Sequence, residues 1–376
     1  MMLTDAQQAL RDVAEAKAKN HLSPMAGAAG DGAINRPLLA ALATHGLLGR
    51  VFRHAEDGGF ERVSAMDLCL LREGLARYCT EAETALALQG LGAYPILLAG
   101  GADVVQRWLP PVASGEIAAG FALTEPAAGS DVAALELAAD PDGDGYRLTG
   151  EKSYISNAPN AGVYSVFART DPGVGARGIT AFAVPGDADG LSGESIRLVS
   201  PHPIGRLAFD GVYVPKEAVL GQVGGGMRVA MDTLNLFRPS VGAFAVGMAQ
   251  AALDAAVAHC GAREAFGKPL REFQGVSHQL ADIATQVEAA RLLVYHAATA
   301  YDAGSADVAK TSAMAKLFAT ETAQRAVDVA IQVHGARALE HGHPLEHLYR
   351  DVRAPRIYEG ASEIQREIIA RVLFRE

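Results

Sequence analysis

Residues that could do chemistry gather in two stretches of the sequence. The first is residues 121–131, where an apolar entry leads into Thr124, a rigid turn at Pro126 and small residues around Gly129. Small residues let main-chain N–H groups approach a ligand closely, which suits an electron-rich ring or a pyrophosphate. The same pattern also fits a tight loop capped at Ser130. The segment alone therefore leaves both interpretations open.

The second stretch is residues 350–371. Ser-Glu-Ile-Gln at 362–365 fits a capping box and predicts a helix that begins there, with its positive end toward Gly360 and Glu359. A carboxylate just outside a helix start, after the apolar Tyr358, can serve as a general base. It can equally be a solvated cap acid. The chain has 43 acidic residues, so the ordinary interpretation holds unless something else singles out Glu359.

Several other chemistries lack their signatures. The sequence contains no GxxxxGK[ST], GxSxG or HExxH motif. A Gly-x-Gly-x-x-Gly run stands at 173–178, but it lies in a predicted loop between β-type runs and does not open a helix, so a nucleotide cofactor would not be held by a Rossmann turn. One histidine-rich stretch could be a metal cluster, formed by His341, His343, Glu346 and His347. A histidine-rich loop that turns into a helix needs no metal, and we predict no metal site.

Composition sets broad limits on the function. The chain has 376 residues, is 49% hydrophobic and carries a net charge of −10, which predicts a globular protein of two or three lobes. The negative charge argues against nucleic acid as a partner. The start has no signal-peptide pattern, and no run of 18 uncharged apolar residues predicts a membrane span. The three cysteines form no CxxC pair, so we predict a reducing, cytoplasmic compartment.

The elements that must position the two stretches change in type along the chain. Helical periodicity fills the first third, with candidate helices at 36–48, 66–78 and 85–99. From about Ala118 to Gly221, short β-type runs between Gly, Asp and Pro predict an antiparallel barrel or sandwich. Its candidate strands are 146–148, 163–168, 179–184 and 207–214.

Helical periodicity then returns and holds to the end of the chain. One face carries Leu280, Ile283, Val287 and Val294 over four turns, and Ala-rich runs predict closely packed helices at 242–258 and 311–333. We therefore predict a mainly α fold with a central β domain. Its domains are residues 1–118, 119–222 and 223–376.

Several short motifs, taken together, resemble those of the acyl-CoA dehydrogenase family. They occur in the family's order and spacing from about residue 85 to the end: Leu123-Thr124-Glu125-Pro126 with Gly129-Ser130-Asp131, Tyr154-Ile155-Ser156-Asn157, Arg263 with Phe266-Gly267-Lys268, Gln274, Gln332, Tyr349-Arg350-Asp351 and Ile357-Tyr358-Glu359-Gly360. Each motif alone is weak. The combination is specific, and the helix–strand–helix layout agrees with it independently.

The resemblance implies an N-terminal helical domain, an antiparallel β domain and a C-terminal four-helix bundle, with FAD between the last two. Thr124 would bond the flavin near N1, Ser156 would approach N5, and Tyr154 takes the place of a usual Trp. The residues implied to bind FAD are Phe121, Leu123, Thr124, Gly129, Ser130, Tyr154, Ile155, Ser156, Arg263, Phe266, Gln274, Gln332, Gly335, Ala361, Ser362 and Glu363. Arg263, Phe266 and Gln274 would reach the FAD of a neighbouring subunit. A homo-oligomer, a tetramer or a dimer, is therefore expected.

The resemblance also implies the reaction. Glu359 would remove the α proton of an acyl thioester while the β hydrogen leaves as hydride to flavin N5. Burial against Tyr358 and an apolar acyl chain should raise the pKa of Glu359 when substrate binds. Relatives that place the base on an internal helix have it immediately before an Arg. Here that position is Phe237, before Arg238, which strengthens Glu359.

Substrate and electron acceptor follow from the same resemblance. The substrate would be an acyl-CoA or acyl-carrier-protein thioester, and the acceptor an electron-transfer flavoprotein. The residues that bind the substrate would be Ser130, Arg238, Leu88, Leu91, Tyr94, Tyr358 and Gly360. Plain core packing explains Leu91 at least as well. The bulk of Leu88 and Tyr94 favours a short or branched acyl chain.

Some positions depart from the family's pattern. Residues 335–339 keep only one glycine of a turn that is usually glycine-rich, and Ala361 replaces a Thr that contacts flavin in the family. Asn235 replaces an acidic residue often found near CoA. Residues 200–204, which lead into a strand, lack the sequence pattern common in members that act on fatty acids. These departures favour a specialised acyl group over an ordinary fatty acid. Two alternatives stay open: a flavin oxidase or monooxygenase on the same fold, and a non-catalytic scaffold.

Overall fold

The computed structural model describes residues 3–30, 32–56 and 58–374. The chain forms two compact units that interleave along the sequence. Unit 1 contains the chain up to Ser23, Ser64–Glu83 and the chain from Asn235 onward, and unit 2 contains Pro24–Val63 and Thr84–Leu234. Two helices, α5 (Thr80–Ala99) and α7 (Gly226–Ala262), pass from one unit to the other along the sequence.

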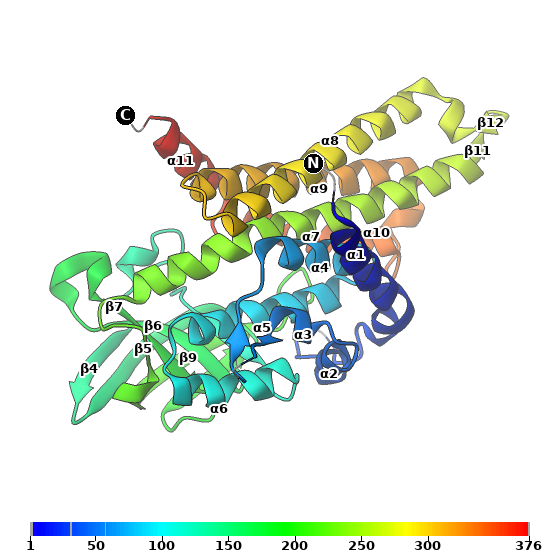
Figure 1. Ribbon diagram of the computed structural model, residues 1–376. Coiled ribbons are helices and arrows are strands. Elements are labelled where there is room, and N and C mark those ends of the chain that lie inside the picture. Colours follow the sequence, from blue (N-terminus) through cyan, green and yellow to red (C-terminus); the bar gives the residue numbers. More distant parts are fainter. Residues whose placement is uncertain (1–2, 31, 57, 375–376) are drawn as a thin grey trace. The chain divides into compact units, whose positions relative to one another are not determined.

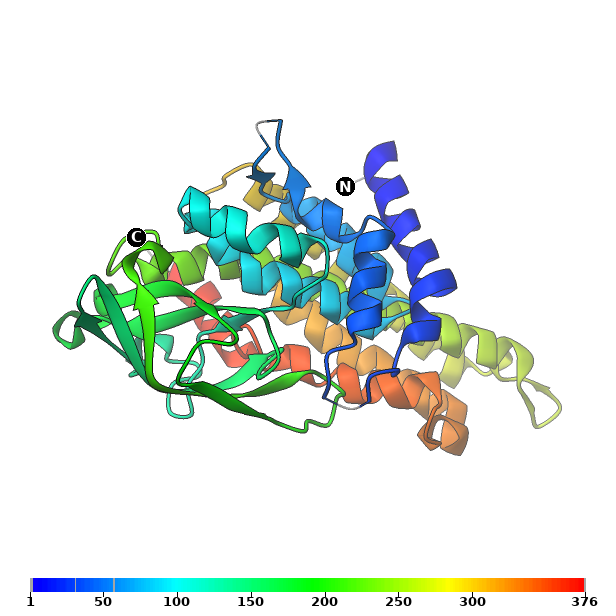
Figure 2. The same cartoon turned by 90° about the horizontal axis from the view of Figure 1, so that it is seen from below.

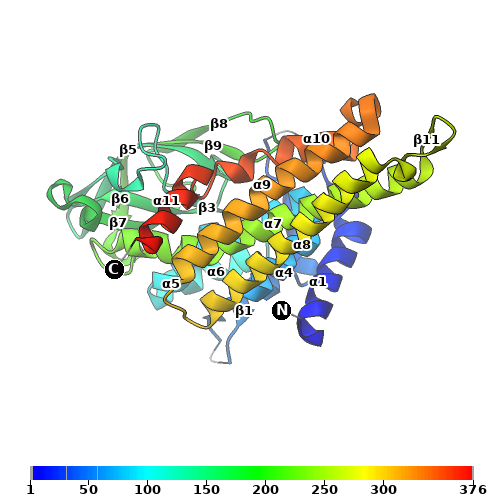
Figure 3. The ribbon, with the colours of Figure 1, turned by 90° about the horizontal axis from the view of Figure 1, so that it is seen from above.

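Unit 1 is helical. Its long helices α7, α8 and α9 run side by side, and α10 and α11 lie along α9 (Figures 1 and 3). Its shorter helices α1 and α4 pack on each other, and α4 also packs on α8. The bounds are α1 Asp5–Lys17, α4 Ala65–Ala76, α8 Gln274–Asp302, α9 Val308–His334, α10 Pro344–Asp351 and α11 Ser362–Leu373. A two-stranded hairpin at the α7–α8 turn consists of β11 (Glu264–Ala265) and β12 (Lys268–Pro269).

Three of the four residues of the predicted apolar stripe on α8 are buried in unit 1, whereas Leu280 is only half-buried. Ile283, Val287 and Val294 are at most 1% exposed. The facing helix α9 contributes small side chains, among them Ala319 and Ala323, both fully buried. Small residues on one helix let the larger apolar side chains of its neighbour fill the space between the two axes.

A charged cluster ties α1, α4 and α8 together. Glu73 on α4 is 4% exposed and accepts hydrogen bonds from Tyr295 Oη at 2.7 Å and Arg291 Nε at 2.8 Å. Arg11 Nη1 lies 3.7 Å from the same carboxylate. Loss of one partner of such a buried pair typically costs about 3–5 kcal/mol. The cluster therefore anchors α4, and with it Arg72, the residue before Glu73.

Unit 2 contains an eight-stranded sheet, whose strands are among the teal and green arrows of Figure 2. Its order is β10-β7-β6-β4-β5-β9-β8, and β3 also pairs with β6. The strands are β3 Ala119–Ala122, β4 Ala138–Asp142, β5 Gly145–Ser156, β6 Val163–Arg169, β7 Ile179–Pro185, β8 Leu191–Ser195, β9 Ile204–Pro215 and β10 Val219–Leu220. Strands β6 and β7 are buried along almost their whole length, whereas β5 and β9 expose many of their side chains.

Besides most of α5, unit 2 contains the helices α2, α3 and α6 and a small two-stranded hairpin. Their bounds are α2 Arg36–Thr44, α3 Leu48–Val51, α6 Ala102–Ala113, β1 Arg53–His54 and β2 Phe60–Glu61. Gln89 of α5 joins this helix to the sheet, because its amide donates to Val112 O and Ile117 O and accepts from Ala119 N. Gly92 allows the close approach, since a Cβ there would lie 2.6 Å from the Ala119 carbonyl carbon.

The predicted layout of helices, then strands, then helices is confirmed, with three local differences. The predicted helix 36–48 is two helices, because Gly46 adopts φ +74° between them. The sheet is not purely antiparallel: β3 runs parallel to β6, and one parallel bridge joins Ala138 of β4 to Arg169. The predicted capping box at 362–365 is wrong. The helix begins at Ser362, but no side chain caps it.

Judged by length and composition alone, helix α7 is long and apolar enough to cross a membrane, because it contains an 18-residue window, or stretch, with a mean hydropathy of 1.5. In that window, however, 67% of the residues are buried inside the protein. The core helix of a globular protein meets the same criterion, so this helix is weak evidence for a membrane span.

Candidate active site

Glu359 lies in a strained turn that precedes α11. Its φ is +52°, and Gly360 follows with φ +92°. A non-glycine residue in the left-handed region is uncommon and costs about 1–3 kcal/mol when neighbouring structure enforces it. Glycine suits position 360, because a φ of +92° is strained for any residue with a side chain, and a Cβ there would also displace the Gln365 amide, whose Nε2 would lie 2.6 Å away. The turn therefore depends on contacts from outside itself.

Two buried side chains supply those contacts. Lys316 of α9 donates from Nζ to Tyr358 O at 3.0 Å and to Gly360 O at 2.6 Å. Gln365 of α11 donates from Nε2 to Gly360 O at 2.8 Å and to Glu359 O at 3.3 Å. Both side chains are fully buried. They explain the missing capping box, since the Gln365 side chain reaches carbonyl groups instead of the N-terminal amide that a box requires.

Burial and three cations act in opposite directions on the Glu359 carboxylate. Burial raises the pKa of Glu359, while Arg72, Lys316 and Arg238 each lower it. The Oε2 atom is buried and has no hydrogen-bond partner. A carboxylate in this state is desolvated yet close to compensating charge, which are the conditions under which a carboxyl group becomes an effective base.

The cations around Glu359 differ in how they are held. Arg72 on α4 is 3% exposed, pairs through Nε with the fully buried Glu83, and donates from Nη1 to Ser240 Oγ at 2.6 Å. Arg238 on α7 donates to Asn235 Oδ1 at 3.2 Å, and its Nε is buried without a partner. Burial lowers the pKa of Arg238, and Glu359 raises it. The side chain of Arg238 therefore still has an unused donor.

In unit 2 a buried ion pair fixes the segment that contains Thr124. Glu125 accepts from Glu136 N at 2.6 Å, Leu137 N at 2.9 Å and Lys152 Nζ at 2.7 Å. Lys152 also donates to Leu123 O at 3.0 Å. A main-chain bond from Ser153 N to Thr124 O, 2.9 Å long, links the same segment to β5. Thr124 is thus held beside the end of the strand that carries residues 154–156.

The predicted cofactor residues of this region differ in their exposure and in their contacts. Tyr154 has φ +57° and is 56% exposed, and Thr124 is half-buried. Gly129 and Ser130 are exposed, and a Cβ at Gly129 would meet no atom within 4 Å, so the main chain there is open to a ligand. The Ser156 hydroxyl, expected to approach a flavin, is hydrogen-bonded to His202 Nε2 at 2.9 Å. The other predicted residues support this surface from behind: Phe121 packs on Phe167, and Leu123 and Ile155 are buried.

A second group of predicted cofactor residues lies at one end of the unit 1 bundle. Arg263 and Gln274 are exposed on either side of the β11–β12 hairpin, and Phe266 at its turn is 97% exposed. Helices α7 and α9 meet at this end, where the rings of His259 and His334 stack at 4.1 Å. The exposed Gln332 and Gly335 belong to the α9 side of this end.

The remaining predicted residues have mixed surroundings. Ala361 is half-buried, Glu363 is exposed, and the Ser362 hydroxyl donates to Glu321 Oε1 at 2.8 Å. On α5, in unit 2, Leu88 is 9% and Tyr94 3% exposed, while Leu91 is half-buried. Of the residues predicted to bind substrate, Arg238, Tyr358 and Gly360 belong to unit 1 with Glu359.

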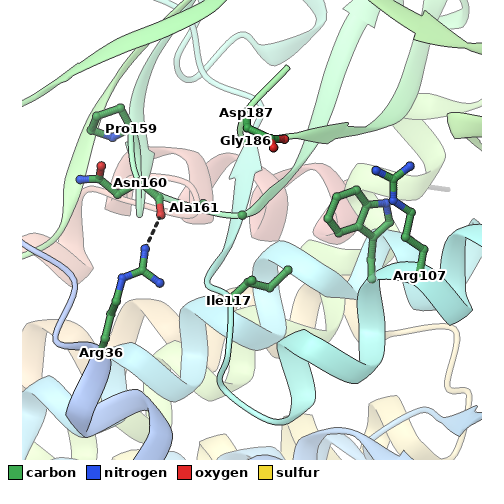
Figure 4. Close-up of a pocket in the computed structure, with 10 residues that line it drawn as sticks. Arg36, Arg107, Ile117, Pro159, Asn160, Ala161, Gly186 and Asp187 are labelled. Atoms are coloured by element: carbon green, nitrogen blue, oxygen red, sulfur yellow. Dashed lines mark hydrogen bonds between the residues drawn. The ribbon is translucent and has the colours of Figure 1, made fainter. Parts of the chain in front are cut away.

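Unit 2 also has a pocket of about 540 Å³ that none of the predicted site residues lines. Figure 4 shows Arg36 pointing toward the loop that contains Asn160, while Arg107 lies on the other side of the pocket. Arg36 Nη2 donates to Asn160 O at 3.1 Å, and the Arg107 guanidinium lies over the Trp108 ring. Both arginines are exposed, so the pocket resembles a solvated groove.

Sequence reasoning missed most of the groups that support Glu359. Arg72, Glu83 and Lys316 belong to no motif, and the sequence pattern assigns Gln365 to a capping box instead of to the support of Glu359. One signal was available for Lys316, because it stands at spacing i, i+4 between Ser312 and Thr320, on the small-residue face of the Ala-rich run at 311–333. A lone Lys on such a face predicts a buried cation with a specific partner.

Known proteins resemble the chain over its whole length. Sequence profiles of the N-terminal, middle and C-terminal domains of acyl-CoA dehydrogenases match residues 4–116, 120–212 and 224–374. A cyclohexane-1-carbonyl-CoA dehydrogenase of Geobacter metallireducens is 36% identical over 96% of this chain and 95% of its own length.

Two solved structures agree with these matches. A glutaryl-coenzyme A dehydrogenase in complex with glutaryl-CoA has a TM-score of 0.92 and 34% identity, covering 100% of this chain and 97% of its own. The FAD complex of PigA has a TM-score of 0.93 and 27% identity, covering 99% and 98%.

The chain therefore belongs to the acyl-CoA dehydrogenase family. It is an oxidoreductase that uses FAD, and the fold expected from the sequence is confirmed.

Proposed function

We propose that this protein oxidises an acyl thioester between its α and β carbons, with Glu359 as the base that removes the α proton. The state of the Glu359 carboxylate carries the proposal: Oε2 is buried without a partner while Arg72, Arg238 and Lys316 act on its charge. A desolvated carboxylate held in one place is suited to a C–H bond that is a poor acid. FAD, when bound, supplies at N5 the acceptor for the β hydride.

The cations near Glu359 also stabilise the negative charge that the substrate develops during the reaction. An α carbanion is accessible only if the negative charge that moves to the thioester oxygen is stabilised as it forms. When Glu359 takes up the proton it loses its own charge, whereas Arg72 and Arg238 keep theirs. The site then favours negative charge on the substrate. Phe237, which is 1% exposed and precedes Arg238, offers no competing base on α7.

The substrate we propose is a short, branched or cyclic acyl thioester. The bulk of Leu88 and Tyr94 on α5 supports it, and so do relatives that act on cyclohexane-1-carbonyl-CoA and glutaryl-CoA. Both CoA and a carrier protein are suitable carriers of the acyl group as a thioester. An electron-transfer flavoprotein is the proposed acceptor, and a homo-oligomer in the cytoplasm the proposed state.

Anaerobic titration of the FAD-loaded protein with a thioester panel tests the proposal. Cyclohexane-1-carbonyl, glutaryl, isobutyryl and butyryl thioesters are each offered on CoA and on a carrier protein, and flavin absorbance is followed. We expect at least one to bleach the flavin. The same titration in air separates a dehydrogenase, whose reduced flavin persists, from an oxidase, whose flavin reoxidises rapidly. If none of the thioesters bleached the flavin, the proposed reaction would be wrong.

A further inference from the structure

Lys316 is an unusual residue in the interior of unit 1. Its side chain is fully buried on α9, between Ser312 and Thr320, which are also fully buried. Burying an ammonium group is expensive unless the group is well hydrogen-bonded. Here both acceptors are main-chain oxygens, at 2.6 and 3.0 Å, rather than the oxygens of a carboxylate. These hydrogen bonds of Lys316 therefore hold main chain rather than a side-chain carboxylate.

The two acceptors flank one residue. Tyr358 O and Gly360 O belong to the residues immediately before and after Glu359, whose own backbone has φ +52°. Fixing both neighbouring peptide groups determines the direction in which the Cα–Cβ bond of Glu359 points. Gln365 adds neutral donors to Gly360 O and Glu359 O. The turn is thus held from two helices, once by a charged and once by a neutral side chain.

We propose that Lys316 is a positioning residue of the active site: its ammonium group holds the carbonyl oxygens on both sides of Glu359, and this aims the carboxylate at the α carbon of the substrate. The inference rests on the proposed function, in which Glu359 is the base. It assigns Lys316 a part in the reaction although Lys316 does not touch the reacting atoms.

The charge of Lys316 gives it a second effect on Glu359. Its positive charge lowers the pKa of Glu359, as do the charges of Arg72 and Arg238, and together they oppose the effect of burial. Burial, and to a lesser extent Arg238, lowers the pKa of Lys316 to about 8, although the charges of Glu359, Glu321 and Glu363 act to raise it. At neutral pH most of the Lys316 population is therefore protonated. Lys316 thus helps to keep the base ionised and ready to accept a proton.

Four substitutions separate positioning, charge and simple stability. Lys316→Met removes both the charge and the hydrogen bonds to the carbonyl groups on either side of Glu359. Lys316→Arg keeps the charge, and Gln365→Met removes only neutral donors. Lys310→Met is the matched control, because Lys310 lies on the same helix but is partly exposed and pairs with Asp307 at 3.2 Å. Each variant is loaded with FAD and mixed anaerobically with the best thioester of the panel. The rate of flavin reduction is then measured from acid to alkaline pH.

We expect Lys316→Met to reduce its flavin about 10²-fold more slowly, the loss typical of a misplaced catalytic group. The acid limb of its pH–rate profile, where the rate falls as pH decreases, should move to higher pH. Loss of a nearby cation raises the pKa of Glu359, and a protonated carboxyl cannot act as base. Gln365→Met should slow the reaction without moving the limb. Lys316→Arg should keep the limb of the wild type, and Lys310→Met should match the wild type in rate and limb.

The inference is overturned if Lys316→Met binds FAD and reduces it at the wild-type rate, or more slowly with an unmoved acid limb. Should that variant fail to fold, Lys316→Gln takes its place, since it keeps a donor and loses the charge, and the same shift of the limb is required. Failure of the proposed function would look different, because wild-type flavin would then not be bleached by any thioester.

Discussion

At the scale of single residues, Glu359 combines two features, each of which lowers the stability of the folded protein. Its backbone is in the left-handed region and its carboxylate is buried. Each feature would destabilise the protein if nothing offset it. The offset comes from the donors of Lys316 and Gln365 and from the charge of Arg72 and Arg238. Costs of this kind concentrated at one carboxylate are typical of a functional group rather than of a cap acid.

Glu359→Gln should abolish the chemistry and leave the cofactor in place. The amide has the shape of the carboxylate but cannot accept a proton. We therefore expect single-turnover flavin reduction by a competent thioester to slow at least about 10²–10⁴-fold, together with α-proton exchange. FAD content and thermal stability should stay near wild type. Glu359→Asp should be impaired less than Glu359→Gln, because it keeps a carboxylate base. It should still be slower than the wild type, because that carboxylate is one methylene further from the α carbon. A Glu359→Gln variant that bleaches at the wild-type rate would assign the base to another residue.

At the scale of elements, α7 and α4 approach each other through a glycine. A Cβ at Gly247 would lie 2.5 Å from Glu73 O and 2.7 Å from Ala76 Cβ, and both atoms belong to α4. Backbone cannot yield as a flexible side chain can, so the two helices would have to separate. This contact matters for the site, because α4 carries Arg72 and α7 carries Arg238.

Gly247→Ala should therefore destabilise the protein by about 1–3 kcal/mol, the usual cost of overpacking. A denaturant titration followed by helical circular dichroism measures the change. Gly261→Ala is the control on the same helix, since a Cβ there meets no atom within 4 Å. It should be neutral or stabilising by up to about 1 kcal/mol, because alanine is the better helix former. Equal effects of the two substitutions would mean that the close approach does not limit stability.

The elements also show which features the sequence predicts and which it does not. Periodicity predicts most of the buried α8 face and, in whole or in part, strands β5, β6, β7 and β9, because burial of these segments leaves a repeat or an apolar run in the sequence. It does not single out β3, β4, β8 or β10. The capping box failed because the same four residues serve a different purpose: Gln365 turns toward carbonyls that only the fold brings near. Arg72 and Glu83, which pair beside the base, carry no local signal since their partners come from separate helices.

At the scale of the whole molecule, the β11–β12 hairpin exposes groups that one chain does not use. Phe266 is 97% exposed with φ +52°, and Arg263 and Gln274 are exposed on either side of it. An exposed aromatic beside an arginine is typical of a surface that is covered in an assembly. Together with the family resemblance, this supports a hairpin that reaches the FAD of a neighbouring subunit.

Arg263→Ala should accordingly weaken FAD binding more than it disturbs the fold. The guanidinium is exposed in the single chain, so its loss removes little from the stability of unit 1. If it pairs with the pyrophosphate of a neighbour's FAD, its loss removes a charge-assisted contact from the cofactor. Flavin retention during gel filtration, measured with light scattering at several protein concentrations, should fall in the variant, and wild-type FAD should dissociate as the oligomer does. Arg271→Ala, at another exposed arginine near the hairpin, serves as the control. A wild-type monomer that keeps FAD with undiminished affinity would show that the hairpin does not serve a partner's cofactor.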